Sequence, residues 1–231
     1  MDATTIQLWL KRLLIPLLLI VPFFTDRYVQ YVLNLIMIYV IVGIGLNFLL
    51  GYAGQFAFAH AALMGIGAYA CALLMSRLAV PFWIALPLAG IVATLVGSLV
   101  ALPAMRMKRV YLALVTLAFA ELIQWILIHW KAVTLGTDGV SVPPTQVFGF
   151  KLTGDHPMAY LILFVTVVMY VLGQRIVTSR FGRALVALRE NEIVAQCSGI
   201  NIARTKLLVF ALSSFYAGIG GGLFALALGS V

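Results

Sequence analysis

Charged residues are scarce in this chain: Asp, Glu, Lys and Arg make up 10% of its 231 residues, whereas hydrophobic residues make up 64%. This composition argues against a water-soluble domain with a polar surface. Cysteine is nearly absent too, since the chain has Cys71 in an apolar run and Cys197 in a polar one. These two residues are expected at different depths, so no disulfide framework is predicted.

Several motifs that carry chemistry are also missing. No G-x-x-x-x-G-K-[ST] loop occurs, so a partner chain would have to bind any ATP that this protein uses. No G-x-S-x-G motif and no pair of carboxylates within one apolar run occur, which gives intramembrane hydrolysis little support. Residues 65–70 match G-x-G-x-x-A but lie inside an apolar helix pattern with no preceding strand, so we reject a dinucleotide site. We predict no catalytic residue, cofactor or metal for this chain.

Long apolar runs dominate what is present. The mean hydropathy is +1.11, and runs of about 20 residues match the length a helix needs to cross a bilayer. We therefore predict an all-α, polytopic bundle of about seven spans, forming one transmembrane domain over residues 1–231. The predicted spans are residues 6–24, 28–50, 57–76, 81–105, 110–130, 158–176 and 207–229. The first is short beyond Lys11 and Arg12, but no small-x-small cleavage site follows it, so we prefer an uncleaved helix to a signal peptide.

The net charge of +8 comes from basic residues at the ends of these runs, so it indicates membrane topology rather than nucleic-acid binding. With the amino terminus inside, 11 of the 15 Lys and Arg residues are cytoplasmic and 4 are outside. The cytoplasmic ones are Lys11, Arg12, Arg106, Lys108, Arg109, Arg175, Arg180, Arg183, Arg189, Arg204 and Lys206, and the outer ones are Arg27, Arg77, Lys131 and Lys151. Residues 131–157, rich in turn residues, are predicted to form an ordered outer loop.

Small residues recur where ordinary spans would have leucine. The rows at four-residue spacing are Gly43, Asn47 and Gly51, then Ala57, Ala61 and Gly65, and in the last run Ser214, Gly218 and Gly222. Such rows let helices approach closely in lipid, which is one interpretation. The other is that Gly51, Gly54 and Gln55 break a helix at a cavity, because broken helices at membrane depth are tolerated only where protein or water satisfies the backbone.

Two ionisable side chains fall inside predicted spans. Glu121, with Gln124 one turn away, is either a functional group or a hydrogen-bonded glutamate between helices, since facing lipid would be costly. His60 has no second ligand at metal spacing, so a packing role is favoured over a metal site. The candidates for a substrate pathway are Asn47, Gly51, Gly54, Gln55, His60 and Glu121.

One long stretch is charged, residues 175–206, and it carries 6 of the 15 basic residues. Apolar residues at helical spacing, a predicted N-cap at Asn191 and a predicted stop at Gly199 indicate short helices. Because Glu190 and Glu192 mix the charge and the apolar stripe is short, we predict that these helices dock on a soluble partner rather than lie on lipid. The predicted contact residues are Leu188, Glu192, Ile193, Val194, Ala195 and Gly199. We call residues 179–206 the cytoplasmic insert.

Four blocks in order resemble the permease subunits of branched-chain amino acid ABC importers, in particular the LivM type. They are LGYAGQFAFAHAALMGIGAYA, VYLALVTLAFAELIQ, TLGTDGVSVP and SRFGRALVALRENEIVAQCSGINIARTKLLVFALSS. The resemblance runs from about residue 39 to residue 223. It implies an inner-membrane permease without chemistry of its own, and it implies that the insert fits a cleft in an ATPase. In the insert, Glu192, Ala195 and Gly199 match the E-A-A-x-x-x-G pattern of such permeases loosely.

The resemblance also implies partners: a second, LivH-like permease, two cytosolic ABC ATPases that bind the ATP, a periplasmic amino-acid-binding protein, and membrane lipid. Such permeases continue through further membrane helices, so we expect this chain to be a fragment or a shortened homologue. Permeases for urea or short amides look alike and remain an alternative. An ion-coupled secondary transporter acting through Glu121, or a membrane enzyme, would be a different class.

Overall fold

The computed structural model describes residues 26–104, 109–136, 139–143, 146–147, 150–151, 155–229 and 231. Its elements are α2 (Arg27–Asn47), the π-helix η1 (Phe48–Tyr52), α3 (His60–Arg77), α4 (Phe82–Ala104), α5 (Arg109–His129), α6 (Lys131–Thr134), β1 (Gln146–Val147), β2 (Phe150–Lys151), α7 (Asp155–Thr178), α8 (Arg180–Glu190), α9 (Glu192–Cys197) and α10 (Ile202–Leu228). The predicted span 6–24 lies outside the described residues.

The helical class is confirmed, whereas the count of seven spans is not. Five of the described helices, α2 with η1, α4, α5, α7 and α10, are long and apolar enough to cross a membrane. The span predicted at 57–76 begins three residues later, because α3 starts at His60 after an irregular segment. The described residues also include a two-stranded antiparallel hairpin in which Gln146 pairs with Lys151 and Val147 with Phe150.

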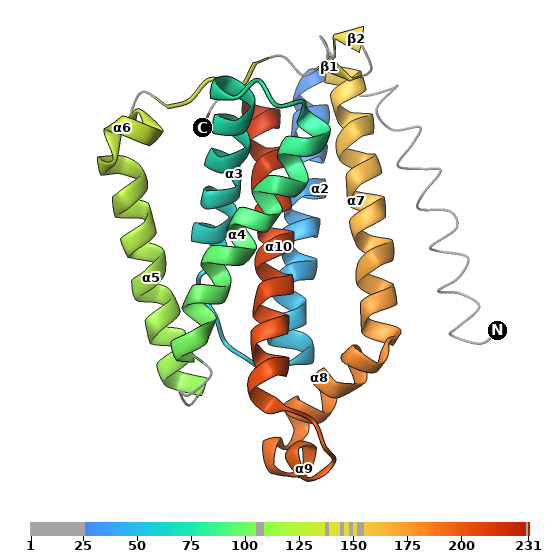
Figure 1. The fold of residues 1–231 in the computed structure, drawn as a ribbon. Helices are drawn as coiled ribbons and strands as arrows, with labels where there is room; N and C mark the ends of the chain where they lie inside the picture. Colours follow the sequence, from blue (N-terminus) through green and yellow to red (C-terminus); the bar gives the residue numbers. More distant parts are fainter. Residues whose placement is uncertain are drawn as a thin grey trace, which may run out of the picture.

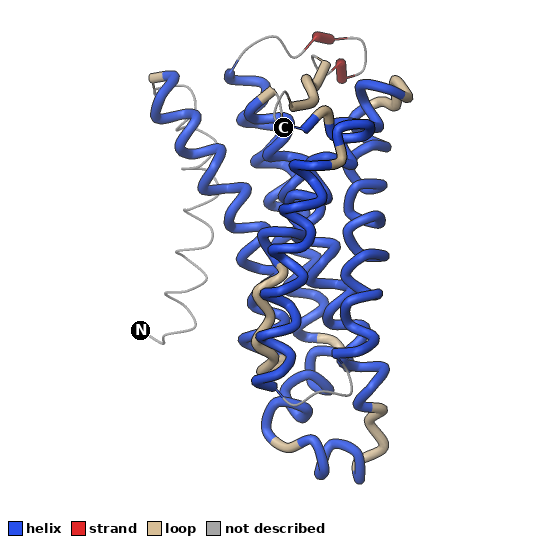
Figure 2. The backbone as a smooth tube through the Cα atoms, turned by 90° about the vertical axis from the view of Figure 1, so that its left-hand side faces the viewer, coloured by secondary structure: helices blue, strands red, loops and turns tan. Residues whose placement is uncertain are grey.

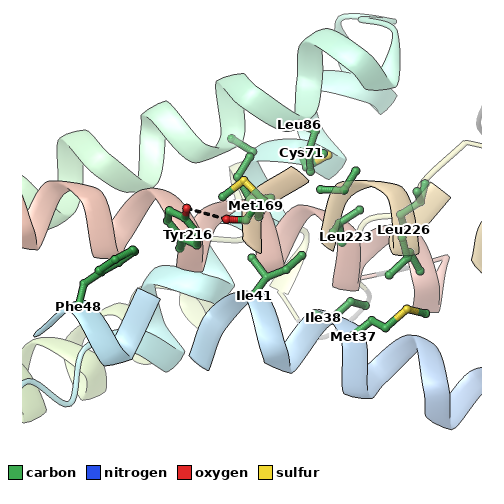
Figure 3. Packing of buried hydrophobic residues seen from close by; sticks show 14 of the residues in the cluster. Met37, Ile38, Ile41, Phe48, Cys71, Leu86, Met169, Tyr216, Leu223 and Leu226 are labelled. Atoms are coloured by element: carbon green, nitrogen blue, oxygen red, sulfur yellow. Dashed lines mark hydrogen bonds between the residues drawn. The ribbon is translucent and has the colours of Figure 1, made fainter. Parts of the chain in front are cut away.

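α10 runs through the centre of the bundle, packed against α2, α3 and α4 (Figure 1). Its amino end is capped by the Asn201 side chain, which accepts a hydrogen bond from the Arg204 amide at 3.0 Å, and its other end stops at Gly229 with a φ of 73°. Inside the bundle the Tyr216 hydroxyl donates to the Met169 carbonyl of α7 at 2.9 Å (Figure 3). Phe48 meets the Tyr216 ring edge to face, with ring centroids 5.3 Å apart. A buried core thus forms around α10.

Glycines make the closest helix contacts. A Cβ at Gly218 would lie 3.0 Å from the Ala89 carbonyl oxygen of α4, and one at Gly221 would overlap the Met64 carbonyl oxygen of α3. Ser214, Gly218 and Gly222 are all buried, which confirms a close helix contact for the row in the last span.

The row that begins in α2 makes no such close helix contact with the described residues. Gly43 and Asn47 are exposed, and a Cβ at Gly43 would meet no atom within 4 Å. Gly45, two residues further along, makes the close contact instead, against Tyr216 and Ser213 of α10. Four-residue spacing identifies a helix face, but it does not say whether that face is turned inward.

The two ends of the bundle differ in the way that the charge pattern predicts. α8, α9, the last turn of α4 and the first turn of α5 lie at one end, and the hairpin, α6 and the carboxyl end of the described chain lie at the other (Figures 1 and 2). At the second end Val140 and Val231 exchange backbone hydrogen bonds of 2.7 and 3.1 Å, so the described part of the 131–157 loop is tied to the end of α10.

Candidate functional site

An irregular segment, called the break below, joins α2 to α3, and the chain reverses its direction there (Figure 1). Residues 53–59 form an irregular stretch that lies alongside the helices (Figures 1 and 2). α2 ends in a π-turn, and Gly54 follows with a φ of 63°, a left-handed conformation that glycine adopts without strain. The Gln55 amide reaches back to the Leu49 carbonyl at 2.9 Å. The chain is therefore irregular where the glycines predict an interruption, but this geometry tests neither a helix broken at a cavity nor a substrate route at Gly51, Gly54 and Gln55.

Side chains from other helices replace the hydrogen bonds that the break removes. The Phe58 amide donates to Thr116 Oγ1 of α5 at 3.0 Å. At the cytoplasmic edge, Arg189 Nη1 of α8 donates to the Gly51 carbonyl at 2.6 Å. A helix broken in a membrane needs such partners, because lipid offers none. The break is thus tied both to α5 and to the cytoplasmic insert.

Thr116→Val should destabilise the bundle, because valine keeps the shape of threonine but cannot accept the hydrogen bond from the Phe58 amide. Leaving an amide unsatisfied costs about 1–3 kcal/mol. The thermal unfolding midpoint of the purified protein should fall with Thr116→Val and stay close to the original with Thr116→Ser, which keeps the hydroxyl. Identical midpoints for both variants would mean that the Phe58 amide finds another partner.

His60 bridges three helices rather than standing alone. Its Nε2 lies 2.6 Å from Ser213 Oγ of α10, and that hydroxyl lies 2.5 Å from the Gly45 carbonyl of α2. A serine has one hydroxyl proton, which must go to the carbonyl, so His60 donates through Nε2 and carries a lone pair on Nδ1. This network gives His60 a packing role. No group of three potential metal-ligating side chains gathers within the part of the chain described here.

Two buried polar atoms near the break lack a partner among the described residues: Gln55 Nε2, a donor, and His60 Nδ1, the acceptor deduced above. Both side chains are well covered, with 4% and 7% of their surface exposed. Buried polar groups nearly always find partners, so these atoms are the ones at the break best suited to meet a polar molecule from outside the chain.

Glu121 faces away from the bundle. It is exposed on α5, as is Gln124, and neither side chain has a partner among the residues that the structure describes. α5 is also the least covered of the five spanning helices. Within its most apolar stretch 11% of the residues are buried, compared with 67% in α10. A carboxyl group on such a surface is costly in lipid. The interpretation of Glu121 as a link between helices of this chain is therefore not supported by the described contacts.

The cytoplasmic insert folds as two short helices with the predicted caps. Asn191 accepts hydrogen bonds from the Ile193 and Val194 amides at 2.9 and 3.2 Å, and Gly199 follows α9 with a φ of 82°. Glu192 forms an ion pair with Lys206 of α10, with Nζ and Oε1 2.9 Å apart. α9 is thereby fastened to the first turns of the central helix.

The predicted contact residues of the insert point in two directions. Leu188 and Ala195 are buried against the chain itself, at 1% and 2% exposure, whereas Ile193 and Val194 are 74% and 61% exposed. Each residue of a helix is rotated by about 100° from the one before it, so Ile193, Val194 and Ala195 cannot all lie on one face of α9. Docking itself is not tested by this geometry, but Ile193 and Val194 are the two apolar side chains of the predicted set available to a partner.

Sequence reasoning did not single out Thr116, Arg189 or Ser213. Each has a local signal in retrospect: Thr116 and Ser213 are hydroxyl residues within apolar runs, and Arg189 ends a helix near the membrane surface. These signals are weak because the partners are distant in the sequence. Thr116 is 58 residues from Phe58, Arg189 is 138 residues from Gly51, and Ser213 is 168 residues from Gly45.

A bundle of membrane-length helices with a break inside it and a capped helical insert at its basic end is typical of membrane transport permeases. Comparison with known families agrees: residues 28–231 match the family described as "Branched-chain amino acid transport system / permease component". The chain belongs to this permease family. Family membership and the five apolar helices together make it a multi-pass protein of the bacterial inner membrane.

Individual relatives carry related names. LivM, the high-affinity branched-chain amino acid transport system permease protein, is 33% identical in Escherichia coli (strain K12) and 32% identical in Salmonella typhimurium, with 100% of this chain and 60% of each relative covered. A probable LivM permease protein of Methanocaldococcus jannaschii is 26% identical over 82% of this chain and 64% of that protein. The chain therefore spans about three-fifths of the length of these relatives. No solved structure matches it.

Proposed function

We propose that this chain is a transmembrane permease subunit of an ATP-driven importer for branched-chain amino acids. The observation that carries the proposal is the insert, which projects from one end of the bundle and contacts the helix break through Arg189 and Gly51. Movement of an ATPase bound to the insert would then be passed through Arg189 to the break, beside which we propose that the substrate crosses the membrane. The names of the LivM relatives support leucine, isoleucine and valine as substrates.

The proposed partners follow from the surfaces that the chain leaves uncovered. Two cytosolic ABC ATPases would supply ATP binding and hydrolysis, one of them docked on Ile193 and Val194. A second permease would cover the exposed face of α5, which carries Glu121 and Gln124. A periplasmic binding protein would deliver the substrate at the opposite end. In this assembly the chain itself binds no ATP and performs no chemistry.

The substrate route is proposed to run along the break, bordered by Gln55 and His60. Glu121 lies on the outward surface of α5, so it would border the route only on the side of the second permease. Gly51 and Gly54 shape the break, whereas Asn47 is exposed in the last turn of α2, one turn before Gly51. Gly54 is a poor site for the bulky substitution that would otherwise probe the route, because every L-residue at a φ of 63° adds about 1–2 kcal/mol of backbone strain.

Transport by the reconstituted complex tests the proposal. Proteoliposomes containing the natural full-length permease, its partner permease and its ATPases should accumulate labelled leucine only with binding protein and ATP. Accumulation driven by a proton gradient with inactive ATPases would indicate an ion-coupled transporter. Uptake of urea or acetamide in place of leucine would favour the amide importers.

Glu121→Leu should weaken association with the second permease more than Glu121→Gln, because glutamine keeps the shape and the hydrogen-bonding capacity of the side chain. A hydrogen bond between membrane helices contributes about 0.6 kcal/mol on average, which corresponds to a change of about threefold in the associated fraction. Quantitative co-purification measures this fraction, and Leu122→Ala on the same exposed surface is the control. If both Glu121 variants abolish uptake equally while the pair stays assembled, the carboxylate charge itself is required.

A further inference from the structure

An apolar groove opens on the side of the bundle at its cytoplasmic end, outside the contacts used above. Its floor is α10, its walls are α4 and the end of α7, and its volume is about 480 Å³. The lining residues are Ile91, Thr94, Leu95, Ile176, Ser179, Phe181, Leu208, Ala211, Leu212 and Phe215. The groove is almost free of polar surface, because the hydroxyl of Thr94 is used locally, donating to the Gly90 carbonyl at 2.7 Å.

The groove follows the direction of an acyl chain in the membrane. Leu208, Ala211, Leu212 and Phe215 form one stripe along α10, and at 1.5 Å per residue this stripe is about 10 Å long. The lining includes Phe181 of α8 at the cytoplasmic side and Phe215, the lining residue farthest along α10. An open apolar channel of this length in the inner half of a membrane suits a hydrocarbon chain.

Three arginines lie close in sequence to the lining residues at the cytoplasmic end of the groove. Arg204 lies on the same stripe of α10, one turn before Leu208, within an arc of about 100° that contains all the lining residues of this helix. Arg180 lies between the lining residues Ser179 and Phe181, and Arg175 directly precedes Ile176. All three arginines are exposed, and none has a side-chain partner among the described residues.

Among the described residues, no acidic side chain compensates this positive charge. Glu192 is engaged by Lys206, and Glu190 lies at the far end of α8. Basic residues beside a cleft between membrane helices at the cytoplasmic surface are a recognised arrangement for anionic headgroups. The apolar groove and its basic rim are therefore complementary to the two parts of one anionic phospholipid.

We propose that the groove binds a single anionic phospholipid of the cytoplasmic leaflet. One acyl chain lies along Leu208, Ala211 and Phe215, and the phosphate is held by Arg204 and Arg180. The lipid wedges between α4 and the α7–α8 turn, so it supports the base from which the insert projects. The site does not depend on which substrate the permease carries.

Photolabelling tests this site in the full-length permease reconstituted with its partners. Vesicles receive a trace of phosphatidylglycerol or phosphatidylcholine with a diazirine near the middle of one acyl chain, and labelled peptides are mapped by mass spectrometry. The phosphatidylglycerol probe should label peptides from the groove in α4 and α10 more strongly than the phosphatidylcholine probe. Each basic residue near an anionic surface changes binding by about fivefold, so Arg180→Gln with Arg204→Gln should reduce groove labelling to the phosphatidylcholine level.

Lys131→Gln is the control, because it removes one basic charge from the exposed surface of α6 at the opposite end of the bundle, and it should leave groove labelling unchanged. Unlabelled phosphatidylglycerol should compete with the probe in the unaltered protein, which keeps the test decisive if the double variant does not fold. Equal labelling by both probes, no effect of the double variant, or a groove crosslinked to a protein helix in place of lipid would each overturn the proposal.

Discussion

Gly221→Ala is expected to destabilise the folded bundle by about 3 kcal/mol, the upper part of the usual range for overpacking a core. A Cβ at this position would overlap the Met64 carbonyl oxygen and lie 2.8 Å from the Ala68 amide nitrogen. Both atoms belong to the backbone of α3, so no side-chain rotation can relieve the clash. The two helices would have to separate along their whole contact.

The matched control is Gly43→Ala, since a Cβ at Gly43 meets no atom within 4 Å and the position is helical. Alanine should be neutral there or favourable by up to about 1 kcal/mol within this chain. Thermal unfolding in detergent and the yield of monodisperse protein measure both variants. Equal stability of the two would show that α3 and α10 are not in the tight contact described above.

Ile193→Asp combined with Val194→Asp is expected to abolish ATP-driven uptake while leaving the permease folded. Both side chains are largely exposed, so the change places charge on a surface without opening the core. Desolvated apolar contacts at the centre of an interface cost about 2 kcal/mol or more each when removed. Two such losses, about 4 kcal/mol together, would reduce ATPase binding by about a thousandfold.

Gln196→Asp adds the same kind of charge to the same helix without removing apolar surface, and it serves as the control. Co-purification of the ATPases and the coupling of hydrolysis to uptake are the measurements. Ala195→Asp is less informative, because Ala195 is buried and the variant would disturb the fold of the insert itself. Normal binding and transport by the Ile193 and Val194 double variant would remove the docking surface from this part of α9.

Hydropathy predicted where the described long helices lie, because crossing a bilayer needs about 20 apolar residues whatever surrounds them. It predicted the caps at Asn191 and Gly199 for an equally local reason, since both depend on the backbone within a few residues. The position of each described helix along the membrane normal could therefore be predicted from the sequence. The direction in which each side chain points around its helix was not.

Particular residues show this limit. The sequence pattern allows both an inward and an outward position for Glu121. It also predicts that Ile193, Val194 and Ala195 contact one partner, although the first two face outward and Ala195 faces inward. The break was recognised from its glycines, but the side chains that complete it, Thr116 and Arg189, come from distant segments. Local patterns do not specify such long-range pairs.

The glycine contacts around α10 have a mechanical consequence. Gly218 meets α4, Gly220 meets Val42 of α2, and Gly221 meets the backbone of α3. Helices interlocked on three sides cannot slide past one another, so these four helices should tilt as a single rigid body, with α9 attached through Lys206. We expect α5, the sparsely packed helix, to move relative to these four helices. The hydrogen bond between the Phe58 amide and Thr116 would hold α5 in place and break when it moves.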